Sequence, residues 1–107
     1  MKDPLVHLED ILSAISKIQQ YTKGFSEEYF SSDEKTQDTV IRQLIVIGEA
    51  ANKVNQDAKE KISNIQWRDI IGMRNILVHD YEVVQIPEIW KVIKSDLTPF
   101  LNAYKNS

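Results

Sequence analysis

Arg74, His79 and Tyr81 bring a permanent cation, a titratable imidazole and a phenol together within one short stretch of the chain. Asn75 follows the arginine and Asp80 separates the histidine from the tyrosine, so the stretch reads R-N-x-x-x-H-x-Y. A guanidinium fork matches the oxygens of a phosphate. An imidazole can take or give a proton near neutral pH. These residue types therefore indicate chemistry at a phosphodiester.

The spacing of the motif limits how one helix can present it. Arg74 and His79 are five residues apart, which corresponds to about 140° around an ideal helix, so the two are not on one face. Asn75 and His79 are four apart and do share a face. Either the helix ends before His79, or the site forms between two surfaces.

The chemistry of RNA cleavage favours a site between two surfaces. Without a metal, a base must deprotonate the 2′-hydroxyl, an acid must protonate the departing 5′-oxygen, and a cation must stabilise the phosphorane between these steps. One chain offers a single histidine in this motif. Two chains related by a two-fold axis offer two histidines and two arginines at a shared groove, so we expect a homodimer.

Each of these residues also has a structural interpretation. A histidine after an apolar helix commonly caps the helix or forms a hydrogen bond, and an arginine within a helix commonly faces solvent or pairs with a carboxylate. Tyr81 can be a half-buried aromatic with its hydroxyl at the rim of the core. The residue types alone leave both interpretations open.

The elements that would position the motif are helical. Asp3-Pro4 predicts a helix start, and the apolar stripe that follows predicts a helix to Lys23 that stops at Gly24. A short turn capped by Ser26 comes next. The same signals then predict a long helix from Ser32 or Asp33 to Val54, a turn at 58–62, a third long helix at 67–79 and a last helix with Pro87 in its first turn. We expect an all-α, up-and-down bundle of four or five helices, forming one domain over residues 1–107.

Small residues and charges on these helices predict further contacts. Gly48, beside Ala50 and Ala51, predicts the close approach of a neighbouring helix, and Gly72 predicts another small contact. Glu49 and Lys53 are four residues apart, which predicts an ion pair on the surface of one helix.

The composition limits the kinds of protein that this chain can be. The net charge of −3 argues against a broad nucleic-acid-coating surface, so any RNA must bind at a small local patch. With no cysteine and two distant histidines, we expect neither a metal site nor a cofactor. The absence of a long apolar run and of a signal-peptide pattern predicts a cytoplasmic protein that does not enter a membrane.

Together these residues resemble a known family. The run from Gly72 to Tyr81 looks like the signature of the HepT-like ribonuclease toxins, a branch of the HEPN-domain superfamily, and residues 47–51, 67–71 and 89–90 are similar to that family too. The resemblance implies a helical dimer with opposed motifs that acts as a metal-independent endoribonuclease, attacking through the 2′-hydroxyl and leaving a cyclic phosphate. It also implies a toxin–antitoxin pair, with a minimal nucleotidyltransferase (MntA-like) antitoxin that transfers AMP onto Tyr81.

The resemblance assigns a role to each motif residue. Arg74 would stabilise the phosphorane, His79 would act as base or acid, and Asn75 would orient the histidine or donate to phosphate. Asp80 would tune His79 or only cap the helix. One departure is Gln66, where relatives tend to have proline, which concerns the stiffness of a loop. The alternative function is a non-catalytic helical partner that binds a nucleotide or substrate for a nucleotidyltransferase.

Overall fold

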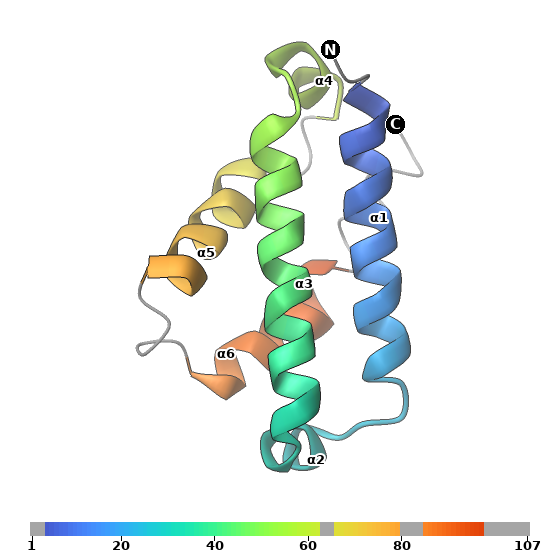
Figure 1. Cartoon of the computed structure of the whole chain (residues 1–107), viewed down its shortest axis with the longest axis vertical. Helices are drawn as coiled ribbons and strands as arrows, with labels where there is room; N and C mark the ends of the chain where they lie inside the picture. The colour runs from blue at the N-terminus through green and yellow to red at the C-terminus, as the bar shows by residue number, and fades with distance from the viewer. Residues whose placement is uncertain (1–3, 63–65, 80–84, 98–107) are drawn as a thin grey trace.

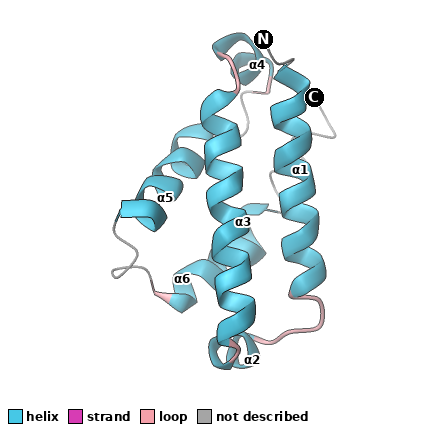
Figure 2. Ribbon diagram, viewed as in Figure 1, coloured by secondary structure: helices cyan, strands magenta, loops and turns pink. Residues whose placement is uncertain are grey.

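The computed structural model describes residues 4–62, 66–79 and 85–97. Its elements in chain order are α1 (Pro4–Tyr21), α2 (Glu27–Ser32), α3 (Glu34–Lys53), α4 (Gln56–Lys61), α5 (Trp67–His79), α6 (Ile86–Lys91) and a π-helical turn, η2 (Val92–Asp96). Every regular element in these ranges is helical (Figure 2), which confirms the all-α prediction for the described residues.

Local side-chain chemistry explains where these helices begin and end. Ser26 and Asp33 cap α2 and α3 by accepting hydrogen bonds from the backbone amides of Tyr29 and Thr36. Asn55 does the same for α4. Gly24 follows α1 with a φ of +79°, a left-handed conformation that glycine adopts without steric cost. The chain therefore turns at Gly24 as predicted, but α1 itself ends at Tyr21, before the predicted last residue Lys23. The predicted cap Asp3 lies outside the described residues.

Helix α3 is the centre of the bundle. It packs against α1 on one side and α5 on the other, and these are the two most extensive helix pairings. Figure 1 shows α1 and α3 running side by side in opposite directions, with α5 inclined against α3 and α6 crossing the lower part of the molecule. None of the helices in the described ranges is both long and apolar enough to cross a bilayer.

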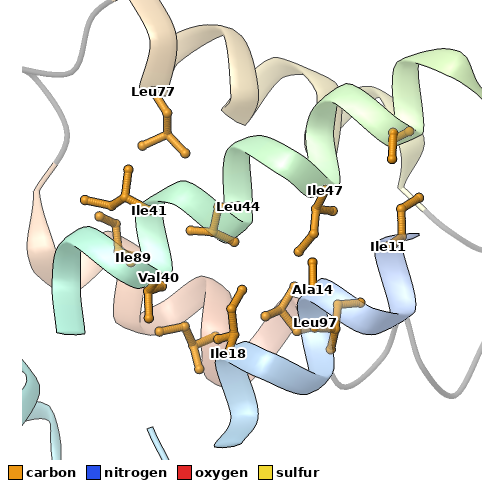
Figure 3. Close-up of a cluster of buried hydrophobic side chains, with 14 of the residues drawn as sticks. Ile11, Ala14, Ile18, Val40, Ile41, Leu44, Ile47, Leu77, Ile89 and Leu97 are labelled. Carbon is orange, nitrogen blue, oxygen red and sulfur yellow. The ribbon is translucent and has the colours of Figure 1, made fainter. Parts of the chain in front are cut away.

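In the described part of the chain, the buried side chains come mainly from α1, α2, α3, α5, α6 and η2. Ile11, Ile15 and Ile18 of α1 are fully buried, as are Phe30 of α2 and Val40 of α3. Figure 3 shows the α1 residues facing one side of α3 while the single labelled side chain of α5, Leu77, reaches α3 from the other side. The core therefore fixes the C-terminal part of α5 against α3.

The structure also adds elements to the predicted bundle. The turn predicted at 58–62 is the short helix α4. The last helix changes from α-helical in α6 to π-helical in η2, which follows α6 directly. Pro87 lies in the first turn of α6, as predicted. Pro99, which by its missing amide is expected to end or kink the last helix, lies outside the described residues.

Candidate functional site

Helix α5 carries Arg74, Asn75 and His79 and is anchored at both ends. At its start, the buried Trp67 donates a hydrogen bond from its indole Nε1 to the carbonyl of Ile62, at 3.1 Å. Near its end, Leu77 is only 3% exposed. The neighbours of Leu77 differ from it, since Ile76 and Val78 are 47% and 42% exposed. The apolar Val78 therefore faces solvent and not the core.

The backbone of Arg74 lies against Gly48 of α3. A Cβ added to Gly48 would overlap the Cβ of Arg74 and stand 2.8 Å from its Cγ and 3.3 Å from its Cα. The close approach predicted at Gly48 is thus confirmed, and the residue that approaches is the arginine of the motif. Among the described residues, an added Cβ at Gly72 meets nothing within 4 Å, so the small contact predicted there is wrong for this part of the chain. The side chain of Arg74 therefore leaves α5 on the side that packs against α3, and its guanidinium lies between these two helices.

The guanidinium of Arg74 has two side-chain partners. Its Nη1 donates to Oδ1 of Asn75 at 3.0 Å, and its Nη2 lies 3.5 Å from Oε1 of Glu49 on α3. The predicted partner of Glu49 was Lys53 on the same helix, but no Glu49–Lys53 ion pair forms among the described residues. That prediction is wrong because the close contact at Gly48 brings the cation of α5 within reach of the next residue of α3.

The Arg74–Glu49 pair is loose enough to open. Its 3.5 Å separation exceeds the roughly 2.7–3.2 Å of a good N–H···O bond. The side chains are 30% and 47% exposed, and exposed ion pairs contribute about 0–1 kcal/mol. The Nε of Arg74 is buried and has no hydrogen-bond partner within the described part of the chain. Nη1 and Nη2 are therefore the donors that an incoming anion can reach, and the anion would compete with Glu49 for Nη2.

His79 is the last residue of α5 and is exposed. The helix remains α-helical through His79, so the alternative in which it ends earlier does not hold. Arg74 and His79 therefore point about 140° apart. A single copy of α5 does not bring the two side chains together. Asp80 and Tyr81 lie outside the described residues.

A polar hollow opens between α3 and α5 next to the guanidinium. Its volume is about 370 Å³ and its lining consists of Glu49, Asn52, Lys53, Ile71, Arg74 and Asn75. Asn52 was not predicted as a residue of the site. The sequence did contain a signal for it, because Asn52 lies four residues after Gly48 and residues four apart share a helix face. No group of three or more histidine, cysteine, aspartate or glutamate residues that could hold a metal ion occurs in the described ranges.

Comparison with known proteins places the chain in a family. Residues 11–106 match the family described as Ribonuclease HepT-like. A protein of Thermococcus cleftensis named as a probable ribonuclease HepT is 41% identical over 85% of this chain and 83% of its own length. A protein of Methanocaldococcus jannaschii, provisionally named an RNase, is 34% identical over 90% of this chain and 88% of its own. No solved structure matches the chain with significance. With the family match spanning nearly the whole sequence, the chain belongs to the Ribonuclease HepT-like family.

Proposed function

We propose that this protein is a metal-independent endoribonuclease that cleaves RNA at a groove shared by two copies of the chain. The family match and the relatives named as ribonucleases support this activity. In the reaction, the 2′-oxygen of a ribose forms a bond to the neighbouring phosphorus while the bond from phosphorus to the 5′-oxygen breaks. The products are a 2′,3′-cyclic phosphate and a free 5′-hydroxyl.

The residues of the motif supply each part of this reaction. One His79 takes the proton of the 2′-hydroxyl, and the His79 of the second copy gives a proton to the departing 5′-oxygen. Arg74 binds the non-bridging oxygens, whose negative charge grows as the phosphorane forms. Asn75 holds one arm of that guanidinium through its Oδ1. Asp80 would tune His79.

The proposal rests mainly on one observation: Arg74 and His79 are both accessible, but they point to different sides of one regular helix. Arg74 emerges beside α3 with donors available, whereas His79 is exposed on another side of α5. Within one copy, His79 points away from Arg74. A second copy, related by a two-fold axis, would place its own His79 next to the Arg74 of the first copy. Exposed Ile76 and Val78 on the same turns support a contact between copies, as does the hollow of about 530 Å³ that includes Ile41, Ile45 and Val46 of α3.

Cleavage of RNA by purified protein tests the activity. We expect Arg74→Ala and His79→Ala each to lower the rate by about a hundredfold or more, since each removes a group that acts in the transition state. The unmodified protein should keep its activity in excess EDTA. Equal cleavage by all three proteins points to a contaminating nuclease, and no cleavage by any of them contradicts the proposal.

We extend the proposal to a toxin whose antitoxin is a minimal nucleotidyltransferase that transfers AMP to Tyr81. An adenylyl group on the phenol would place a bulky anion two residues from His79. Intact-mass measurement of the protein co-expressed with its genomic neighbour should show one added adenylyl group, which Tyr81→Phe should remove. An unchanged mass in active co-expressed protein contradicts this extension but not the nuclease activity.

A second candidate function rests on the same arginine. Its pairing with Glu49 and the net charge of −3 favour a non-catalytic helical partner that binds a nucleotide or substrate for a nucleotidyltransferase. That alternative predicts an adenylyl adduct at Tyr81 together with no cleavage by the unmodified protein. The two experiments above therefore separate the alternatives.

A further inference from the structure

The polar hollow between α3 and α5 extends away from Arg74, beyond the groups that the reaction uses. Asn52 and Lys53 line it from α3, and Ile71 and Asn75 line it from α5. Its volume of about 370 Å³ lies within the range of small-ligand sites. The reaction explains the guanidinium at its edge but gives no role to Asn52, Lys53 or Ile71.

The lining of the hollow is mainly polar. Among its described residues, Ile71 is the single apolar one beside two carboxamides and three charged groups. The second hollow, along α3, instead has three apolar residues, Ile41, Ile45 and Val46, beside the charged Asp38, Arg42 and Glu49. The first hollow therefore offers mostly hydrogen-bonding groups, which fix the orientation of a polar ligand.

The two carboxamides match the edge of a nucleobase. A carboxamide carries a donor and an acceptor side by side, which is how asparagine pairs with adenine in two hydrogen bonds. Asn75 already accepts from Arg74 through its Oδ1, so its amide nitrogen remains to donate. No hydrogen bond of the Asn52 side chain occurs among the described residues, and that side chain is exposed. Both of its functions are therefore available.

We propose that this hollow is a nucleotide subsite in which Asn52 holds the base attached to the phosphate that Arg74 binds. The proposal rests on the proposed function, since it takes single-stranded RNA as the ligand. In single-stranded RNA the Watson–Crick edge is open to a protein. Adenine and cytosine present an amine beside an unprotonated ring nitrogen on that edge, so one carboxamide can accept from the amine and donate to the nitrogen. Uracil presents a carbonyl beside an N–H, and the same carboxamide can pair with that edge after turning over, so Asn52 would hold either kind of base. Ile71 gives the base an apolar surface, and Lys53 provides a second cation for the backbone.

Titration with nucleoside 3′-monophosphates tests the subsite separately from catalysis, because these ligands contain no phosphodiester to cleave. We expect the unmodified protein to bind the adenosine, cytidine and uridine 3′-monophosphates about tenfold or more tightly than inorganic phosphate, with shifts in the side-chain amide NMR signals of Asn52 and Asn75. Asn52→Ala should remove the preference while leaving the affinity for inorganic phosphate unchanged. Gln19→Ala, at an exposed position of α1, should change neither.

Each outcome of the titration decides the question. A preference for the nucleotides over inorganic phosphate that survives Asn52→Ala would overturn the subsite. Nucleotides that bind no more tightly than inorganic phosphate would overturn it as well, by showing a phosphate site alone. If the unmodified protein binds the nucleotides more tightly than phosphate but cleaves no RNA, the nuclease assignment fails and the subsite stands. If it cleaves RNA, Asn52→Ala should raise the KM for RNA, because it removes a contact to the bound nucleotide.

Discussion

At the scale of single residues, Arg74 shows how one side chain serves both packing and chemistry. Its Cα and Cβ lie against Gly48, while its guanidinium reaches Glu49 and Asn75 at the edge of the polar hollow. The structural interpretation, in which this arginine pairs with a carboxylate, is therefore confirmed. It does not compete with a role in catalysis, because an exposed pair of this length releases the cation at small cost.

The charge of Glu49 should oppose binding of phosphate at Arg74. Glu49→Gln keeps the size and the acceptor oxygen of this side chain but removes a negative charge next to the guanidinium. A unit charge at about 4 Å contributes about 1 kcal/mol in a water-like dielectric, so we expect affinity for RNA to rise a few-fold. The free energy of unfolding should change by about 1 kcal/mol or less, because the pair is exposed.

Measured Kd values over a salt series, together with urea unfolding, check this expectation for Glu49→Gln. The gain in affinity should shrink as salt screens the charges. Lys53→Gln provides the matched control, since it removes the other charge that α3 places at the hollow and should weaken binding instead. Weaker binding of RNA by Glu49→Gln would mean that Glu49 mainly orients the guanidinium.

At the scale of helices, the contact between α3 and α5 fixes the site. Gly48 lets the backbone of α5 approach at Arg74, and Leu77 secures the next turn in the core. Gly48→Ala should therefore force the helices apart at the arginine, at a cost of about 1–3 kcal/mol from overpacking, offset in part by the better helix propensity of alanine. We expect lower stability in urea unfolding and weaker phosphate binding.

Gly72→Ala is the control for this prediction, because it makes the same chemical change on the opposing helix. In the part of the chain that the structure describes, an added Cβ there meets nothing within 4 Å. Alanine should then stabilise α5 by up to about 1 kcal/mol. Similar unfolding curves for the two variants would contradict the role assigned to the contact at Gly48.

Much of the helical framework could be predicted from the sequence because its signals are local. The caps at Ser26 and Asp33, the turn at Gly24 and the extent of α5 depend on residues within a few positions of each other. The wide turn η2 was not predicted, since one turn with shifted hydrogen bonds leaves the spacing of apolar residues almost unchanged.

The parts of the site that sequence reasoning missed depend on contacts between helices. Spacing within α3 suggested Lys53 as the partner of Glu49, but the partner is Arg74, which lies 25 residues away in the chain. Gly48 and Gly72 carry the same local signal, and only the packing of α5 on α3 distinguishes them. Asn52 looked like an ordinary polar helix residue until that packing placed it in the hollow.

At the scale of the whole molecule, the central question is whether one copy or two copies make the active site. The regular course of α5 directs Arg74 and His79 to different sides, so the proposed chemistry needs a second chain. The exposed Ile76 and Val78 then lie on the same turns of α5 as the two residues proposed to be catalytic, where they can pack against that chain. On this basis, we expect the protein to be a dimer by light scattering at micromolar concentration.

Dilution of the unmodified protein with an inactive chain tests the shared site directly. The double variant Arg74→Ala/His79→Ala lacks both groups, so a mixed dimer retains one guanidinium and one imidazole, both on the same chain. If cleavage needs a histidine from each copy, mixed dimers should be almost inactive, and the rate should follow the fraction of unmodified dimers, which native mass spectrometry measures. If each chain instead contained its own complete site, every mixed dimer would keep half of the activity, and the rate would follow the fraction of unmodified chains. A rate that falls only in proportion to the unmodified chains would therefore rule out a site that needs both copies, whereas a rate that falls with the unmodified dimers would require it.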